Sequence, residues 1–182
     1  MTGTADGGAR TAPVCIIGAG PCGLAAAIAL KQAGVPAVVF EQGCLVSSVS
    51  QYPTYITFFS TAEKISTGAL PFPIAGDKPT RREAMAYYRA ATAHFGLDVR
   101  QYERVVETRR DGAGFVVASE PQGGERREMT ARAIVVATGY FGTPNRLGVP
   151  GEELPHVTHF FREGHDGFQQ DVVVVGGGNS AV

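Results

Sequence analysis

Residues 16–24 read IIGAGPCGL, and this stretch with its flanking segments decides the fold. An apolar segment, VCIIG (14–18), leads into it, and a segment rich in Ala and Leu follows. A second apolar segment, AVVFE (37–41), comes next and ends in a glutamate. Strand, helix and strand in this order, with continuous rather than alternating hydrophobicity, predict a parallel sheet that is covered on both faces.

The glycine pattern between the first strand and the helix is G-x-G-x-x-G. In this context each glycine has a physical reason. Gly18 permits a tight turn, Gly20 lets the backbone approach a pyrophosphate, and Gly23 lets the helix pack close to the strand. The phosphates would lie at the helix N-terminus, where free N–H groups favour anions. Glu41 is placed to accept hydrogen bonds from an adenosine ribose, so the unit is predicted to bind a dinucleotide.

A second turn of the same kind occurs at the end of the chain. Residues 171–182, DVVVVGGGNSAV, predict a buried strand and a glycine turn 158 residues after the first. Two such turns are typical of enzymes that bind a flavin at the first turn and a nicotinamide cofactor at the second. The chain stops where the helix of the second turn should begin. We therefore expect it to be the N-terminal part of a longer protein.

The intervening residues predict one long loop, one helix and an inserted sheet. Residues 42–79 are irregular and aromatic, and a loop of that length is more often functional than idle. The following segment predicts a helix with a capping box of Thr80 and Glu83, closed by Gly96, in which Arg81 and Arg82 are solvated. Three alternating segments then indicate an antiparallel meander, at 97–110, 114–121 and 125–132. AIVVATG (133–139) returns to a buried strand.

The predicted fold class is therefore α/β. It comprises a Rossmann-like FAD-binding domain with an inserted antiparallel β-meander, and the truncated start of a second Rossmann-like NAD(P)-binding domain. The predicted boundaries are a disordered tail (1–12), the N-terminal part of the FAD-binding domain (13–144), a connector (145–170) and the first strand and glycine turn of the second domain (171–182).

Composition excludes several other classes of protein. The 182 residues include 16 basic and 17 acidic side chains, which offer no electrostatic footprint for nucleic acid or an anionic membrane. No apolar run approaches the roughly 18 residues of a membrane span. The first residues lack the apolar core of a signal peptide, and three cysteines at unrelated spacings do not form a disulfide framework. We expect a cytoplasmic protein.

Three stretches carry a resemblance to a known family. The first fingerprint, VVATGYFGTPNRLGVPGE (135–152) and VVVVGGGNSAV (172–182) resemble the two-dinucleotide-binding-domain flavoproteins, which include thioredoxin reductases and flavin monooxygenases. SVSQYPTYITFFSTAEKISTGALPFP (48–73), with the Pro-Cys of the fingerprint, is more specifically similar to bacillithiol-disulfide reductase (YpdA-type) flavoproteins. Ala19 stands where many members have glycine, which is a mild departure.

The resemblance implies an FAD enzyme that oxidises NADPH and reduces the disulfide of a low-molecular-weight thiol. It implies that Cys22 is the redox residue and that the protein forms a homo-oligomer, since dimers are usual in the family. The full set of predicted cofactor-binding residues is Gly18, Ala19, Gly20, Pro21, Cys22, Gly23, Glu41, Gln42, Ser48, Tyr52, Val105, Ala137, Thr138, Gly139, Gly176, Gly178, Asn179 and Ser180. NADPH and NADH are not distinguished by these residues.

The thiols are weighed by position. Residues 140–175 contain no cysteine, so the C-x-x-C of thioredoxin reductases is missing there, and the position five after Cys44 is Val49, so no C-x4-C is present. Cys15 lies within the first strand and is interpreted as a core residue, and Cys44 as incidental. Cys22 stands in the first turn of a helix, where the dipole favours a thiolate, although a bound pyrophosphate would oppose it. Catalysis and packing both remain open for Cys22 from its position alone.

Two other functions compete with the reductase. A flavin monooxygenase would need no thiol, but FFREGHDGF (160–168) does not match the F-x-G-x-x-x-H pattern of that class. A flavin-binding redox sensor without turnover is the third reading. His156, His159 and His165 are near one another in sequence, but no cysteine or acid pair with metal-ligand spacing accompanies them, so no metal site is predicted.

Overall fold

Two sheets and four α-helices form in the part of the chain that the structure, a computed structural model, describes: residues 12–178 and 181. The strands are β1 (Val14–Ile17), β2 (Ala37–Glu41), β3 (Val99–Gln101), β4 (Glu103–Asp111), β5 (Gly114–Pro121), β6 (Arg127–Ala131) and β7 (Ala133–Val136). The helices are α1 (Pro21–Gln32), α2 (Ser47–Ser50), α3 (Ala62–Ile65) and α4 (Arg81–His94), with a 3-10 turn η1 (Gly164–Gly167).

The predicted strand–helix–strand unit around the glycine turn is confirmed. Strand β1 pairs in parallel with β2 on one side and with β7 on the other, in the sheet order β3-β2-β1-β7. Helix α1 ends at Gln32, and Gly34 follows in the left-handed region with φ 69°. The capping box of α4 is also present: Glu83 N donates to Thr80 Oγ1 at 3.3 Å, and Thr80 N donates to Glu83 Oε2 at 2.8 Å.

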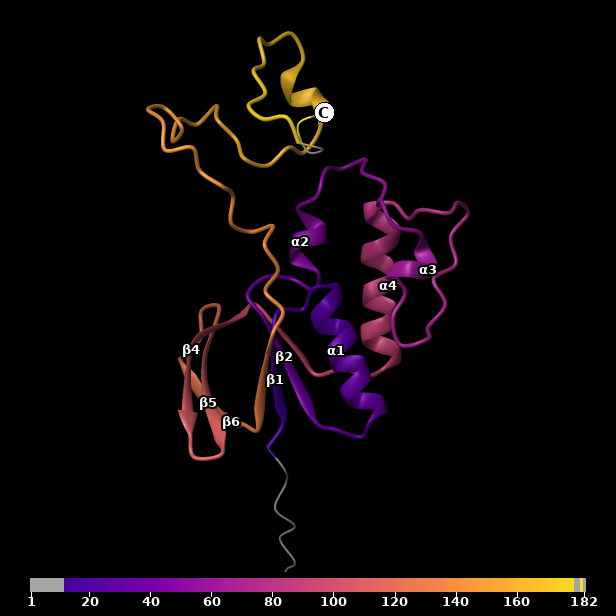
Figure 1. Cartoon of the computed structure of the whole chain (residues 1–182), viewed down its shortest axis with the longest axis vertical. Helices are drawn as coiled ribbons and strands as arrows, with labels where there is room; N and C mark the ends of the chain where they lie inside the picture. The colour runs from indigo at the N-terminus through magenta and orange to yellow at the C-terminus, as the bar shows by residue number, and fades with distance from the viewer. Residues whose placement is uncertain (1–11, 179–180, 182) are drawn as a thin grey trace, which may run out of the picture.

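The parallel sheet lies between the helices and the antiparallel sheet (Figure 1). Alternate residues of β1 face opposite layers. Val14 and Ile16 pack with Leu24 of α1 and Tyr88 of α4, whereas Cys15 packs with residues of the antiparallel sheet such as Val117. Both faces of β1 are therefore buried, which explains its continuous hydrophobicity.

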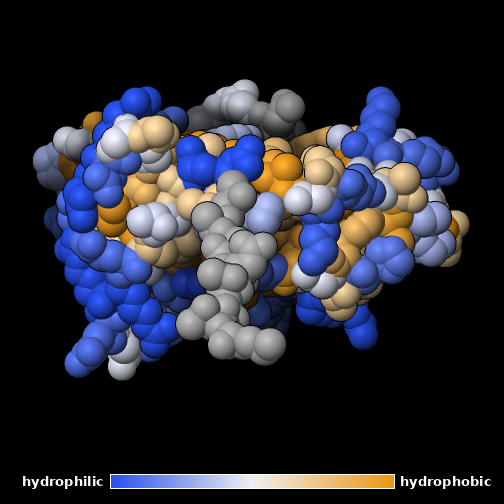
Figure 2. All heavy atoms as spheres, turned by 90° about the horizontal axis from the view of Figure 1, so that it is seen from below, coloured by the Kyte–Doolittle hydropathy of each residue, from blue (hydrophilic) through white to orange (hydrophobic). Residues whose placement is uncertain are grey.

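The antiparallel sheet has the order β4-β5-β6 and is more polar on its outer side, at the left of Figure 2. Its outward side chains include the ion pair of Arg109 with Glu128, at 3.2 Å. The sequence prediction was wrong at its start, because residues 97–110 do not form one meander strand. The chain breaks at Tyr102, which has φ 55°, and residues 99–101 join the parallel sheet beside β2 instead.

Two predicted strands also differ from the structure. Strand β7 covers only Ala133–Val136 and is not fully buried, since it is an edge strand and Val136 is 71% exposed. Residues 171–178 form no strand, and Val172–Val175 are 63–86% exposed. A strand needs hydrogen-bonded neighbours, and within the described residues this segment pairs with none. Residues 1–11 of the predicted tail lie outside the described residues.

The carboxyl ends of β1 and β2 point toward the segment that follows β7 (Figure 1). That edge of a parallel sheet is where open α/β folds bind ligands. No helix among the described residues is long and apolar enough to cross a membrane.

Candidate functional site

The glycine turn is packed tightly, both within itself and against the segment that follows β7. A Cβ on Gly23 would lie 1.9 Å from the Gly18 carbonyl oxygen, and a Cβ on Gly18 would lie 2.4 Å from the Ala137 carbonyl oxygen. Gly18 also has φ 109°, a conformation that favours glycine. Ala137 N donates to Ile17 O at 2.8 Å, so the Ala137–Gly139 stretch runs directly beside the turn. The structure therefore brings together the two segments that the sequence predicts for one site.

The N-terminus of α1, just after Gly20, is open. A Cβ on Gly20 would meet nothing within 4 Å, in contrast to Gly18 and Gly23. Within α1 no side chain caps the N-terminus and the first turn contains no acidic residue. Pro21 is the first residue of the helix and has no N–H to leave unsatisfied. Free N–H groups, a favourable dipole and open space are what an anionic group requires.

The thiol of Cys22 stands at this open end. Cys22 is the second residue of α1 and is exposed. Cys15 is fully buried in β1, and burial raises the pKa of its thiol to about 11 against the opposing charge of Arg100. Cys44 is half-buried, with Sγ 3.8 Å from Ser50 Oγ. Of the three cysteines of the chain, Cys22 is thus the exposed one at a helix N-terminus.

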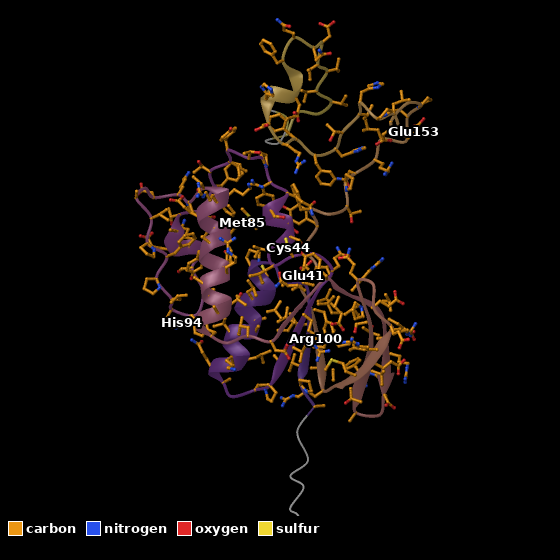
Figure 3. All side chains as sticks on the ribbon, turned by 180° about the vertical axis from the view of Figure 1, so that it is seen from behind. Glu41, Cys44, Met85, His94, Arg100 and Glu153 are labelled. Atoms are coloured by element: carbon orange, nitrogen blue, oxygen red, sulfur yellow. The ribbon has the colours of Figure 1, made fainter. Side chains whose placement is uncertain are left out.

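Glu41 lies at the carboxyl end of β2 and organises the turn from the side. Its carboxylate is buried and accepts hydrogen bonds from Ala19 N and Gly43 N, both at 2.9 Å, and from Ser47 Oγ at 3.0 Å. Figure 3 shows Glu41 at this edge of the sheet with Cys44 next to it. The neighbouring Gln42 is exposed. Sequence reasoning named Glu41 but missed Ser47, because only the one-turn helix α2 brings that serine back to the carboxylate.

An aromatic cluster connects the loop after α2 with the segment that follows β7. The Tyr52 ring lies 4.8 Å from Phe141 and 5.9 Å from Phe58, measured between centroids. Burial raises the pKa of Tyr52 above its ordinary value, and the nearby Tyr140 adds to this rise. Because Phe141 follows Gly139 by two residues, its contact with Tyr52 puts the tyrosine beside the Ala137–Gly139 stretch, as predicted from the sequence. Phe59, in the same loop as Tyr52, is 79% exposed.

The loop before α4 is held from the N-terminus of that helix. Arg81 Nη1 donates to the Ser50 carbonyl oxygen, and Arg81 N donates to Ile56 O at 3.1 Å. The expectation that Arg81 is simply solvated was wrong, because its guanidinium is part-buried against the end of α2. Ser48, in the middle of α2, is half-buried. Arg81 therefore fixes the segment that carries Ser48 and Tyr52.

Among the remaining predicted site residues, Thr138 and Gly139 lie beside the glycine turn, and the others that the structure describes lie away from it. Val105 lies in β4 and packs against the cluster that contains Cys15 and Phe40, on the side of the parallel sheet away from the helices. Gly176 and Gly178 are exposed, and residues 171–175 before them form no strand. Thr138 and Gly139 are exposed beside the first turn. Asn179 and Ser180 lie outside the described residues.

A carboxylate also fixes the connector. Glu152 Oε1 accepts from Leu147 N at 2.9 Å and lies 2.8 Å from His159 Nε2, and Oε2 accepts from Gly148 N at 2.7 Å. The hydrogen bond from His159 and those from the two backbone N–H groups lower the pKa of Glu152 to about 2. His159 is hydrogen-bonded to Glu152, and in the described residues no three His, Cys, Asp or Glu side chains come together as a metal site.

The hydrogen bonds of the Glu152 carboxylate predict that the local stability of the connector depends on pH. Because the folded-state pKa of Glu152 is depressed, its contribution is full above the ordinary carboxyl value and is lost as pH falls through about 2. We expect the amide protection factors of Leu147 and Gly148 to fall as the pH drops below about 4.5, the ordinary carboxyl value. Glu152→Gln should lower both at neutral pH. Unchanged protection in that variant, measured by hydrogen exchange, would contradict the assignment.

Comparison with known proteins gives consistent matches. The family model described as pyridine nucleotide-disulphide oxidoreductase matches residues 15–182. The chain is 45% identical over 168 residues to bacilliredoxin reductase Bdr of Bacillus subtilis, covering 92% of this chain and 50% of that protein. The solved bacillithiol disulfide reductase Bdr (YpdA) of Staphylococcus aureus superimposes with a TM-score of 0.88 at 40% identity, covering 94% of this chain and 52% of the other.

Monooxygenases are more distant. A flavin-containing monooxygenase from Stenotrophomonas maltophilia has a TM-score of 0.65 at 26% identity, covering 75% of this chain and 41% of its own. The fold is therefore that of the Rossmann-type flavoproteins, as predicted. The chain spans about half the length of the curated relatives it matches.

Proposed function

The chain belongs to the pyridine nucleotide-disulphide oxidoreductase family, and from this premise we propose that it binds FAD in an NADPH-oxidising enzyme that reduces a low-molecular-weight thiol disulfide. Bacillithiol disulfide is the proposed substrate, because the similar reductase of Staphylococcus aureus carries that substrate in its name. The observation that carries the proposal is the exposed Cys22 thiol at the open, uncapped N-terminus of α1.

The residues present fit an FAD pyrophosphate at this place. The open space at Gly20 would take the phosphates, with the free N–H groups of α1 as donors. Glu41 would face the adenosine ribose, and the Ala137–Gly139 stretch with Tyr52 would border the flavin. A bound FAD supplies two-electron transfer from the nicotinamide cofactor to the disulfide.

Cys22 would carry the thiol chemistry. Its thiolate attacks one sulfur of the substrate disulfide, forming a Cys22–substrate disulfide while the substrate S–S bond breaks and one thiolate leaves. The two electrons that NADPH provides then cleave the mixed disulfide. This restores the Cys22 thiolate and releases the second substrate thiolate. Of the two protons that the substrate thiolates take up, one derives from the hydride of NADPH and the other comes from solvent. Exposure of Cys22 gives the substrate access without moving the core.

The experiment follows NADPH oxidation by the intact protein with bacillithiol disulfide, with glutathione disulfide and with oxygen alone. We expect bacillithiol disulfide to raise the rate at least about 10-fold over oxygen, since reduction by a placed thiolate should exceed slow flavin autoxidation. Equal rates with and without disulfide would defeat the reductase proposal. Oxygen uptake that rises with an added organic substrate would favour a monooxygenase instead. A parallel series with NADH in place of NADPH shows which nicotinamide cofactor the protein prefers.

A further inference from the structure

The Glu41 carboxylate is nearly saturated by the chain itself. Ala19 N donates to Oε2, whereas Gly43 N and Ser47 Oγ both donate to Oε1. A carboxylate offers about four acceptor positions, so the acceptor capacity that remains lies on Oε2. Two of the three donors are backbone groups whose positions follow from the turns. The hydroxyl of Ser47 is the one donor that a side-chain substitution can remove.

Ser47 is itself firmly placed. It follows Val46, whose backbone is in the left-handed region with φ 50° and whose N–H donates to Ala19 O at 3.1 Å. The carbonyl of Ser47 accepts from Ser50 Oγ at 2.7 Å, and Arg81 in turn donates to the Ser50 carbonyl. A hydrogen-bonded path therefore runs from the start of α4 through α2 to the carboxylate beside the glycine turn.

The packing around Ser47 leaves little freedom for its side chain. A Cβ on Gly43 would come within 3.1 Å of the Ser47 Cβ, so the loop and α2 are in contact on this side. Val46, directly before the serine, and Val49, two residues after it, are 1% exposed. The backbone of α2 is thus anchored by two buried valines, and the Ser47 hydroxyl donates to Glu41 from that anchored backbone.

We propose that Ser47 is a positioning residue for adenosine recognition: its hydroxyl holds Glu41 Oε1 so that the remaining acceptor capacity of Oε2 is presented to the ribose of FAD. The inference rests on the proposed function, since it assumes that FAD is the ligand. Ser47 acts through Glu41 and needs no contact with the flavin. Ser47→Ala leaves Oε1 with Gly43 N as its single donor, so the carboxylate is held by two hydrogen bonds in place of three.

The test measures FAD dissociation constants of the intact apoprotein by quenching of flavin fluorescence. Loss of one hydrogen bond to an ionised group predicts that Ser47→Ala binds FAD about 10-fold more weakly. Ser47→Thr, which keeps the hydroxyl, should restore most of the affinity. Ser66→Ala is the matched control, because the Ser66 hydroxyl donates to the Glu63 carbonyl at 2.7 Å in α3, away from Glu41.

A double-mutant cycle with Glu41→Ala separates positioning from general loosening of the loop. If Ser47 acts through Glu41, Ser47→Ala in the Glu41→Ala background costs no further affinity. Additive losses in the two backgrounds would overturn the proposal, as would unchanged FAD affinity in Ser47→Ala itself. If the parent protein binds no flavin, it is the proposed function that fails. If the parent binds FAD and Ser47→Ala has the same dissociation constant, only the proposed role of Ser47 is wrong.

Discussion

Gly20→Ala is expected to leave the fold intact and to remove flavin binding. Gly20 has φ −74° and ψ 178°, which alanine adopts without strain, and its Cβ would meet no atom within 4 Å. The same Cβ would project into the open end of α1, where the proposed pyrophosphate must approach the backbone. We expect FAD affinity to fall at least about 100-fold, the consequence of a steric conflict of about 3 kcal/mol.

The neighbouring glycine gives the contrasting result. Gly23→Ala puts a Cβ 1.9 Å from the Gly18 carbonyl oxygen, so α1 must shift away from β1. It should lower the melting temperature of the apoprotein, whereas Gly20→Ala should change it little. Gly76→Ala serves as a control, because Gly76 is exposed and its Cβ also meets nothing. If Gly20→Ala binds FAD with parental affinity in a fluorescence titration, the proposal that the pyrophosphate binds at Gly20 is wrong.

The elements predicted correctly are those in which local chemistry and tertiary packing agree. The βαβ unit rests on glycines whose neighbours leave no room for a Cβ, and α4 starts at a capping box that its own four residues form. Both signals are contained in short stretches of sequence. The position of Glu41 beside the glycine turn was predictable for the same reason, because it is the last residue of the second strand.

The errors occur where the outcome depends on distant residues. Nothing local in residues 97–110 marks the break at Tyr102, whose N–H donates to the Gly43 carbonyl at 2.9 Å, far away in sequence. Val172–Val175 have the composition of a buried strand, but β-structure requires a neighbour to pair with. Ser47 was not predicted, because its contact with Glu41 depends on the left-handed backbone of Val46.

The second large effect concerns Cys22. The three cysteines differ in the access that disulfide exchange requires: Cys15 is fully buried with a pKa of about 11, Cys44 is half-buried beside Ser50, and Cys22 is exposed. A buried thiol that stays protonated near neutral pH is a poor nucleophile. If a single sulfur in this chain attacks a disulfide, these surroundings favour Cys22.

Cys22→Ser is therefore expected to lower disulfide-dependent NADPH oxidation by at least about 10³-fold, as removal of a nucleophile does in other enzymes. FAD affinity should stay within about 2-fold of the parent, because serine is nearly isosteric and the position is exposed. Cys44→Ser is the matched control and should keep parental turnover. Mass spectrometry of the parent with excess disulfide should detect one substrate thiol attached at Cys22. Turnover of Cys22→Ser at the parental rate would show that the Cys22 thiol takes no part in the reaction.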